Sequence, residues 1–350
     1  MSGSTHTGRR GVTCVGEAMV VLTPEGQVPV EESQSLHRAV GGAEANAARM
    51  VAALGVPARF VSRVGADPFG RVVLAALHTA GVDDSAVQAD PERGTGLYVK
   101  APSAAGSTLY YYRSESAATT MDGPFFALAA VDRALATAVV VHTSGITAGV
   151  LTDPDALVQA LIRHRDRGAL LSVDLNWRPA LWRGRGDQPM RDLLGVADLV
   201  FVGADEARAA LGSDKAPALR RLVRPGATIV VKSDAHAAAA LLPDGRTVVE
   251  PALTVDVVEP VGAGDAFAGG YLAGLVSGLT VAGRLRLGHL CAATVLVSSQ
   301  DHAIPPGHAD RARLLASSAE RWATIRVSGP LDDAGPRVES VPRTSLEVDR

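Results

Sequence analysis

The chain has 350 residues, of which 47% are hydrophobic, 20% are charged and only 4% are aromatic. This composition predicts a globular protein with a large aliphatic core, and no apolar stretch of the sequence is long enough to cross a bilayer. The formal net charge of -3 gives no reason to expect nucleic acid or a membrane surface as a partner.

The two cysteines, Cys14 and Cys291, lie far apart in the sequence, and each sits in an apolar run. Buried free thiols in a reducing compartment are the simplest interpretation. Arg9 and Arg10 precede an apolar stretch, but Glu17 interrupts it early, which favours a first strand over a secretory segment. We therefore expect a cytoplasmic protein.

Strands and helices alternate along the chain after a small, polar segment (residues 1–11) that we expect to be flexible. Hydrophobic patterning predicts strands at 12–15, 20–22, 59–64, 138–142, 170–174, 199–202, 228–231 and 238–242. It predicts helices at 43–54, 69–80, 155–167, 266–277 and 285–298. This alternation indicates an α/β protein, specifically a three-layer α/β/α sandwich with a mainly parallel central sheet.

One region interrupts the alternation. Residues 95–101 and 107–113 have strand-like alternation around the turn-forming segment 102–106, which predicts an antiparallel hairpin. With residues from about 23 to 40, the region 95–115 could form a small accessory sheet. Beyond residue 326 the chain is rich in proline, serine and charge, so we expect one domain over 12–325 and a loosely ordered tail over 326–350.

The most informative segment is Glu259-Pro260-Val261-Gly262-Ala263-Gly264-Asp265, which leads into an apolar helix pattern. Small residues at a helix N-terminus leave backbone amides uncovered, and such amides attract anions such as phosphate. Asp265 places a carboxylate at the same point, where it could take a proton from an attacking hydroxyl. The alternative is a first-turn aspartate that the helix dipole favours.

Other polar segments are weaker signals on their own. Gly41 and Gly42 precede the first long helix, where paired glycines let the backbone pass close to a ligand and Asn46 could offer an amide. Asp174, Asn176 and Arg178 follow a strand with a period of two, which would put them on one face at the ligand-binding edge of a parallel sheet. An ordinary glycine-rich loop and a solvated strand end are the respective alternatives.

The predicted hairpin carries a candidate anion clamp. Tyr111 and Arg113 would share one face of the hairpin, while Tyr110 and Tyr112 would point to the other. A guanidinium group can hold a carboxylate with two hydrogen bonds, although an ordinary surface arginine is the alternative. The nine histidines show no metal-ligand spacing, so we interpret His302 as structural or loop-exposed.

Taken together, these residues resemble the ribokinase-like (PfkB) carbohydrate kinases from about residue 12 to 305. The N-terminal signature of the family is matched by Gly41-Gly42-Ala43-Glu44-Ala45-Asn46, and its C-terminal signature from 260 to 272, with Asp265 at the position of the catalytic base. Within the family, the chain is most similar to 2-keto-3-deoxygluconate kinases. The segments behind that similarity include Gly16-Glu17-Ala18-Met19, Gly96-Leu97-Tyr98, Tyr111-Tyr112-Arg113, Ser144-Gly145-Ile146-Thr147 and Asp174-Leu175-Asn176-Trp177-Arg178.

The resemblance implies ATP-dependent phosphorylation of a sugar acid, 2-keto-3-deoxygluconate, at O6. Asp265 would be the general base, and the amides of Gly262, Ala263 and Gly264 would form the anion hole. The sugar acid would be bound by Gly41, Gly42, Asn46, Tyr98, Tyr111, Arg113, Ile146, Asp174, Asn176, Arg178 and Asp265. The two arginines would hold the acid group and present O6 to the base.

On the nucleotide side, the resemblance implies ATP with Mg²⁺ and leaves a monovalent cation open. Lys232, Ser233, Asp234, Gly262, Gly264 and Asp301 would bind the nucleotide, and Glu206 could contact the metal indirectly. The accessory sheet would act as a lid and as the contact of a homo-oligomer.

The chain departs from the family pattern on the nucleotide side. Glu259 replaces an expected Asp or Asn, Asp234 and Ala237 replace glycines, and Gly203 stands where relatives often have Asn or Ser. Three hypotheses therefore stay open: a sugar-acid kinase of the gluconate or galactonate type, a kinase of a neutral sugar such as fructose or ribose, and a sugar-acid-binding homologue with weakened catalysis.

Overall fold

The computed structural model describes residues 10–103, 106–233, 235–299, 303–329 and 337–340. Its centre is a nine-stranded sheet in the order β13-β12-β11-β10-β9-β8-β1-β4-β5, in which β12 runs antiparallel to both neighbours and the other pairs are parallel. The strands are β1 (Val12–Val15), β4 (Ala58–Gly65), β5 (Asp83–Asp90), β8 (Val140–Ser144), β9 (Leu170–Asp174), β10 (Leu199–Gly203), β11 (Thr228–Ser233), β12 (Ala237–Leu241) and β13 (Thr247–Pro251).

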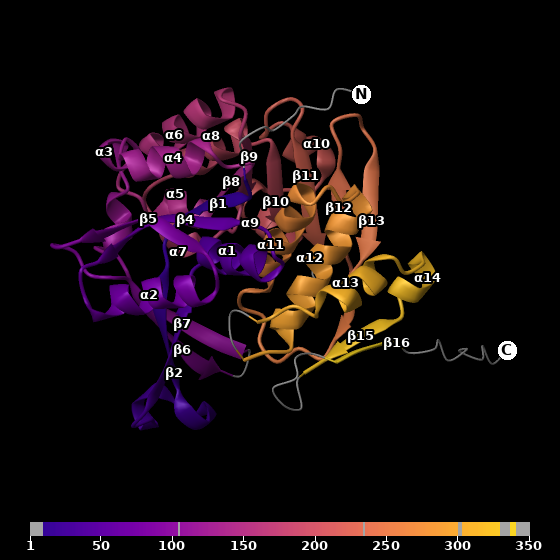
Figure 1. The fold of residues 1–350 in the computed structure, drawn as a ribbon, viewed down its shortest axis with the longest axis horizontal. Helices are drawn as coiled ribbons and strands as arrows, with labels where there is room; N and C mark the ends of the chain where they lie inside the picture. Colours follow the sequence, from indigo (N-terminus) through magenta and orange to yellow (C-terminus); the bar gives the residue numbers. More distant parts are fainter. Residues whose placement is uncertain (1–9, 104–105, 234, 300–302, 330–336, 341–350) are drawn as a thin grey trace.

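Helices cover both faces of this sheet, so the predicted three-layer α/β/α sandwich is confirmed (Figure 1). One layer contains α1 (Ala43–Ala53), α2 (Pro68–Thr79), α11 (Ala263–Val276) and α12 (Val281–Leu296). The other contains α3 (Gly123–Phe126), α4 (Ala129–Ala136), α5 (Gly145–Val150), α6 (Pro154–Asp166), α7 (Pro179–Trp182), α8 (Gln188–Val196), α9 (Ala204–Leu211) and α10 (Ala216–Arg220).

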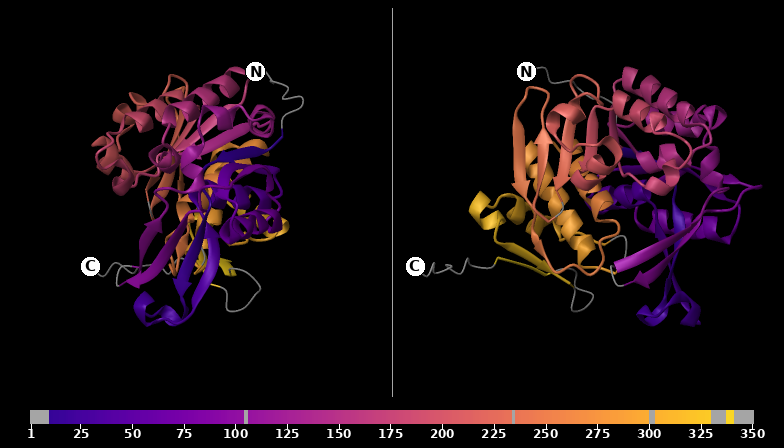
Figure 2. Two further views of the ribbon diagram at one scale, coloured as in Figure 1. Left: turned by 90° about the vertical axis from the view of Figure 1, so that its left-hand side faces the viewer. Right: turned by 180° about the vertical axis from the view of Figure 1, so that it is seen from behind.

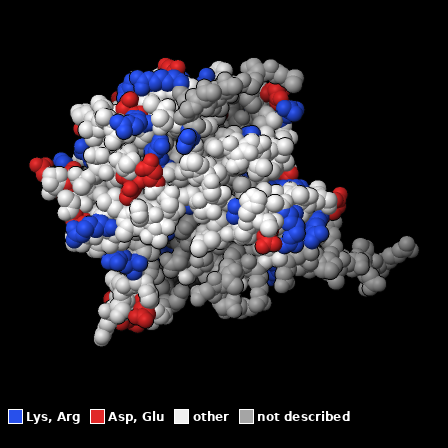
Figure 3. Space-filling view, in the orientation of Figure 1, with Lys and Arg blue, Asp and Glu red and all other residues white. Residues whose placement is uncertain are grey.

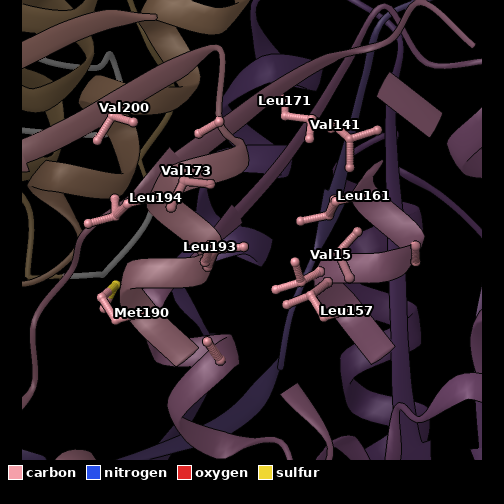
Figure 4. Close-up of a cluster of buried hydrophobic side chains, with 14 of the residues drawn as sticks. Val15, Val141, Leu157, Leu161, Leu171, Val173, Met190, Leu193, Leu194 and Val200 are labelled. Atoms are coloured by element: carbon pink, nitrogen blue, oxygen red, sulfur yellow. The ribbon is translucent and has the colours of Figure 1, made fainter. Parts of the chain in front are cut away.

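The strands are apolar on both sides because both sides are covered. In β1, Val15 belongs to the core cluster against α6 and α8, while Val12 and Cys14 belong to the opposite cluster against α1 and α11. Figure 4 shows Val15 in the first of these clusters, beside Leu157 of α6. This burial on both faces explains why the parallel strands read as continuous apolar runs.

A separate four-stranded sheet, in the order β3-β2-β6-β7, projects from the main body (Figure 2). Its strands are β2 (Met19–Pro24), β3 (Leu36–Gly41), β6 (Leu97–Ser103) and β7 (Gly106–Tyr112), with short 3-10 helices η1 (Glu25–Gln27) and η2 (Val30–Glu32) between β2 and β3. The predicted hairpin is β6–β7, paired antiparallel. We call this four-stranded sheet the lid sheet. The strand predicted at 20–22 lies in its centre rather than in the main sheet.

The C-terminal part is more ordered than its composition suggested. After α13 (His308–Leu315) and α14 (Ala319–Trp322), β15 (Ile325–Ser328) pairs in parallel with β14 (Thr254–Val255) and antiparallel with β16 (Arg337–Ser340). The expected loosely ordered tail over 326–350 is therefore wrong for residues 326–328 and 337–340. Val327 and Trp322 are fully buried, so apolar packing overrides the polar composition around them.

The long helices lie where the sequence predicts them. The structure adds η3 (Ala117–Thr120) and confirms the predicted helices to within a few residues. The expected flexible segment falls on residues 1–9, which lie outside the described residues, and on 10–11, which precede β1. No helix in the described part of the chain is long and apolar enough to span a membrane. On the face in Figure 3, acidic and basic side chains are interspersed.

Trp322 gives a test of the C-terminal packing. Its indole Nε1 donates to the Pro251 carbonyl at 2.9 Å, and the Arg286 guanidinium lies 5.1 Å from its ring centroid. We expect Trp322→Ala to lower the free energy of unfolding by about 3–5 kcal/mol, as for other buried aromatic truncations. Urea denaturation measures this loss. Glu320→Ala, an exposed change on the same helix, is the control, and an equally small effect of both changes would contradict the packing.

Candidate active site

A cavity of about 630 Å³ lies where the carboxyl ends of β9, β10 and β11 meet the N-terminus of α11 and the lid sheet. Ligands bind at this edge of open parallel sheets because the strand ends and helix N-termini converge there. Most of the predicted site residues line the cavity: Gly42, Asn46, Tyr98, Tyr111, Arg113, Ile146, Asp174, Asn176, Arg178, Glu206, Lys232, Gly262, Ala263, Gly264 and Asp265.

Asp265 lies at the centre of the cavity, in the first turn of α11. Each of its carboxylate oxygens accepts a hydrogen bond from a side-chain amide, one from Asn46 Nδ2 at 3.0 Å and the other from Asn176 Nδ2 at 3.4 Å. Burial raises its pKa to about 7; the Asn46 hydrogen bond lowers the pKa and the nearby Asp174 carboxylate raises it. A carboxylate with such a pKa is well suited to accept a proton near neutral pH.

The loop before α11 is shaped by glycine. Gly262 is the N-cap residue and has φ 86° and ψ -12°, a left-handed conformation that favours glycine. The first amides of a helix have no acceptor within the helix, so the Gly264 amide is suited to an anion, while the Ala263 N–H donates to the Pro260 carbonyl at 3.3 Å. A Cβ added at Gly264 would lie only 3.4 Å from Lys232 Nζ, which places a cation beside the same loop.

Lys232 comes from the end of β11 and lies among three carboxylates. Its Nζ is 2.8 Å from Asp174 Oδ2. Burial alone would lower its pKa, but Asp174, Glu206 and Asp265 together outweigh burial and raise it. Lys232 therefore stays an ammonium group and balances part of the acidic charge around Asp265.

The lid side of the cavity carries the predicted clamp. The guanidinium of Arg113 lies 5.6 Å from the ring centroid of Tyr111, which in turn packs on Tyr98 at 5.4 Å. The Arg113 side chain is 9% exposed and forms an ion pair with Glu17, whose other oxygen accepts a hydrogen bond from the Ser116 hydroxyl. Arg113 thus faces the cavity with its position fixed by a buried acid.

Arg178 approaches from the opposite wall. Its Nη1 lies 2.8 Å from Glu206 Oε1, and 47% of its side chain is exposed. Its Nη1 also donates to the Trp177 carbonyl at 2.9 Å, and an acid ligand could compete with these acceptors for the exposed guanidinium.

The expected reason for the Asp174, Asn176 and Arg178 alignment is wrong, although all three line the cavity. The strand β9 ends at Asp174, Asn176 has a left-handed φ of 38°, and Pro179 opens α7. An irregular loop with a left-handed Asn176, and not a strand period of two, brings the three side chains to the cavity.

Gly42 explains the glycine pair at the start of α1. It has φ 130°, and a Cβ there would lie 2.2 Å from the Glu17 carbonyl oxygen. Only glycine lets this backbone pass between the lid sheet and the cavity. Gly41 ends β3 and Ser233 ends β11, and neither is among the lining residues. Asp234 and Asp301, with His302, lie outside the described residues.

One apolar part of the cavity contains residues that were not predicted from the sequence. An apolar wall there comes from the segment after β13 and from α12, with Ala252, Leu253, Val255, Val257, Ala292, Ala293 and Leu296. The alternation of Leu253, Val255 and Val257 was the available signal. Such a wall is suited to a flat apolar group such as a nucleobase.

No group of three or more His, Cys, Asp or Glu side chains forms a metal site within the described residues. The carboxylates of Asp174 and Glu206 at the cavity are already paired with Lys232 and Arg178. This donor set fits an ion that arrives on nucleotide phosphates, with Glu206 as the candidate for an indirect contact.

Comparison with known proteins agrees with this geometry. Residues 9–306 match the sequence model of the pfkB family carbohydrate kinases. The chain is 31% identical to a 2-dehydro-3-deoxygluconokinase of Thermoproteus tenax, over 84% of this chain and 91% of the relative, and 31% identical to Fructokinase-1 of Zea mays, over 77% and 84%. The structure of a putative Ribokinase II from E. coli with ATP and Mg²⁺ has the same fold, with a TM-score of 0.75, 20% identity, and coverage of 83% and 94%.

The family match spans the strands, the carboxylate and the glycine loop that build the cavity. The chain belongs to the pfkB family of carbohydrate kinases.

Proposed function

We propose that this carbohydrate kinase phosphorylates the sugar acid 2-keto-3-deoxygluconate at O6 with ATP as the donor. The single observation that carries the proposal is that Arg113 and Arg178 line the same cavity as Asp265. A neutral sugar needs no arginine pair, whereas a sugar acid has a carboxylate at the end opposite its reacting hydroxyl. The Thermoproteus tenax relative supports this substrate by its name, and the maize fructokinase supports the neutral-sugar alternative.

In the proposed reaction, Asp265 accepts the proton of the O6 hydroxyl as O6 forms a bond to the γ-phosphorus of ATP. The bond from that phosphorus to the bridging oxygen breaks, and ADP leaves. The Gly264 amide and Lys232 lie where they can stabilise negative charge on the transferring group. Mg²⁺, bound with the nucleotide, neutralises phosphate charge. After transfer, the proton leaves from Asp265.

The lid sheet supplies further proposed roles. Tyr98, Leu109 and Tyr111 line the cavity from the lid sheet, so this sheet can exclude water from the sugar. Tyr110 and Tyr112 are 54% and 63% exposed on β7, which is an edge strand. An exposed aromatic edge favours pairing with a second copy of the chain, so we also propose a homo-oligomer through the lid.

Replacing the base tests the mechanism. We expect Asp265→Asn to lower kcat by about 10²–10⁴-fold, because no group then takes the hydroxyl proton. A coupled assay for ADP measures turnover with the sugar acid. Calorimetry should show unchanged sugar binding, and the melting temperature at pH 8 should not fall, because the change removes a buried ionised group. Near wild-type turnover would disprove the role of Asp265.

The raised pKa of Asp265 predicts the pH dependence. Only the ionised carboxylate accepts a proton, so kcat/KM for the sugar should fall about tenfold per pH unit below about pH 7. Asn46→Ala removes a hydrogen bond that lowers this pKa, so its acid limb should move to higher pH. The measurement is a pH profile at saturating ATP and Mg²⁺. If the acid limb of the wild-type profile instead fell near the ordinary pKa of an aspartate, Asp265 would not be the general base.

Arg178 separates the sugar acid from a neutral sugar. Losing a charge-assisted hydrogen bond costs about 1.5–3 kcal/mol, so Arg178→Gln should raise KM for the sugar acid by roughly 10- to 150-fold with little change in kcat. Arg208→Gln, an exposed change on α9, is the control. The neutral-sugar alternative is correct if the wild-type enzyme prefers fructose or ribose and Arg178→Gln does not change kcat/KM for that sugar. Sugar-acid binding without turnover in the wild type would indicate the weakened homologue.

A further inference from the structure

The hairpin β6–β7 is tied to the segment that precedes the glycine loop. Lys100 of β6 lies with its Nζ 3.0 Å from Glu259 Oε2, and the Ser107 hydroxyl of β7 donates to the same oxygen at 2.9 Å. Both strands of the hairpin therefore contact one carboxylate, which belongs to the segment between β14 and α11.

The other oxygen of Glu259 faces the loop itself. Glu259 Oε1 accepts the backbone N–H of Val261 at 3.1 Å, one residue before Gly262. A single side chain thus bridges the lid sheet and the loop that leads to the Gly264 amide. The bridge joins residues more than 150 positions apart in the chain.

This bridge is buried, and its charges are matched. Lys100 is 4% and Glu259 is 7% exposed. Burial alone would raise the pKa of Glu259, but the Val261 amide, Lys100 and Ser107 outweigh burial and hold that pKa below its usual value. Separating the pair would remove the Lys100 ammonium group from the Glu259 carboxylate in a poorly solvated place, which is strongly unfavourable.

We propose that the Lys100–Glu259 pair is a latch that couples the position of the lid sheet to the conformation of the glycine loop. Leu109 and Tyr111 of the same hairpin line the cavity opposite Gly262 and Asp265. When the lid lifts, Lys100 and Ser107 leave Glu259, and Val261 loses the carboxylate that orients its amide. Lys100 and Glu259 are positioning residues, and their effect on catalysis rests on the proposed role of the loop.

The first test needs no substrate. Hydrogen exchange of the free protein is compared for wild type, Lys100→Met and Lys100→Met/Glu259→Gln, the last of which removes both charges of the pair. We expect faster exchange both in 97–112 and in 259–264 in each variant. Asp256→Asn is the control: it removes an exposed ion pair with Arg326 three residues before Glu259 and should change neither segment. Faster exchange of the lid with an unchanged loop would overturn the latch.

The second test reads the coupling in catalysis. We expect kcat to fall by roughly 10²-fold in Lys100→Met/Glu259→Gln, because small misplacements of catalytic groups have effects of this size. ATP hydrolysis in the absence of sugar should rise relative to sugar phosphorylation. Lys100→Arg keeps a cation beside the Glu259 carboxylate and leaves that carboxylate able to accept the Val261 N–H, so it should retain more of kcat than Lys100→Met. Unchanged kcat and coupling in the double variant would overturn the proposal.

The two tests separate this inference from the proposed substrate. Coupled exchange in a protein that phosphorylates only neutral sugars would leave the latch standing and reject the sugar-acid assignment. Independent exchange of the two segments in a proven sugar-acid kinase would do the reverse.

Discussion

The site depends on one buried carboxylate that must stay reactive. Asp265 lies at the N-terminus of α11, a helix that is buried along most of its length, and the lost solvation raises its pKa to about 7. Two amides, from Asn46 and Asn176, approach its oxygens, and the cation of Lys232 lies nearby. The Asn46 hydrogen bond and the cations of Arg178 and Lys232 limit the rise of the pKa, so part of Asp265 is ionised near neutral pH.

The architecture follows from bringing these groups together. Asn46 comes from α1, Asn176 from the loop after β9, and Lys232 from the end of β11, so their approach to Asp265 depends on the order of the parallel strands. The Lys232–Asp174 pair joins β11 to β9 across the end of β10. A change in strand order would scatter the site, whereas a change in a surface helix would leave it intact.

The two arginines of the cavity show how charge is distributed in it. Arg113 is paired with the buried Glu17, and Arg178 with the half-buried Glu206, so neither arginine is a bare cation. An acidic ligand would enter a site whose arginines are already paired with carboxylates. It would gain the most binding free energy from the arginine that is held less firmly by its present partner. Arg178 fits that description better than Arg113, because nearly half of its side chain is exposed.

The sequence alone determined the α/β class, the positions of the long helices, the β6–β7 hairpin and the family, because apolar periodicity and glycine-anchored signatures are local features. Most of the site residues that it predicted line the cavity. The sequence did not determine that β2 leaves the main sheet for the lid sheet, that residues 325–328 form a strand, or that Asn176 turns the chain at the cavity. These outcomes depend on contacts between segments distant in sequence.

Tertiary structure alone decided the state of the charges. Neither the pairing of Lys100 with Glu259 nor that of Arg113 with Glu17 carries a sequence spacing signal. The pKa of Asp265 likewise depends on burial by elements from four parts of the chain. A side chain's charge depends on its solvation and its neighbours, and folding supplies both.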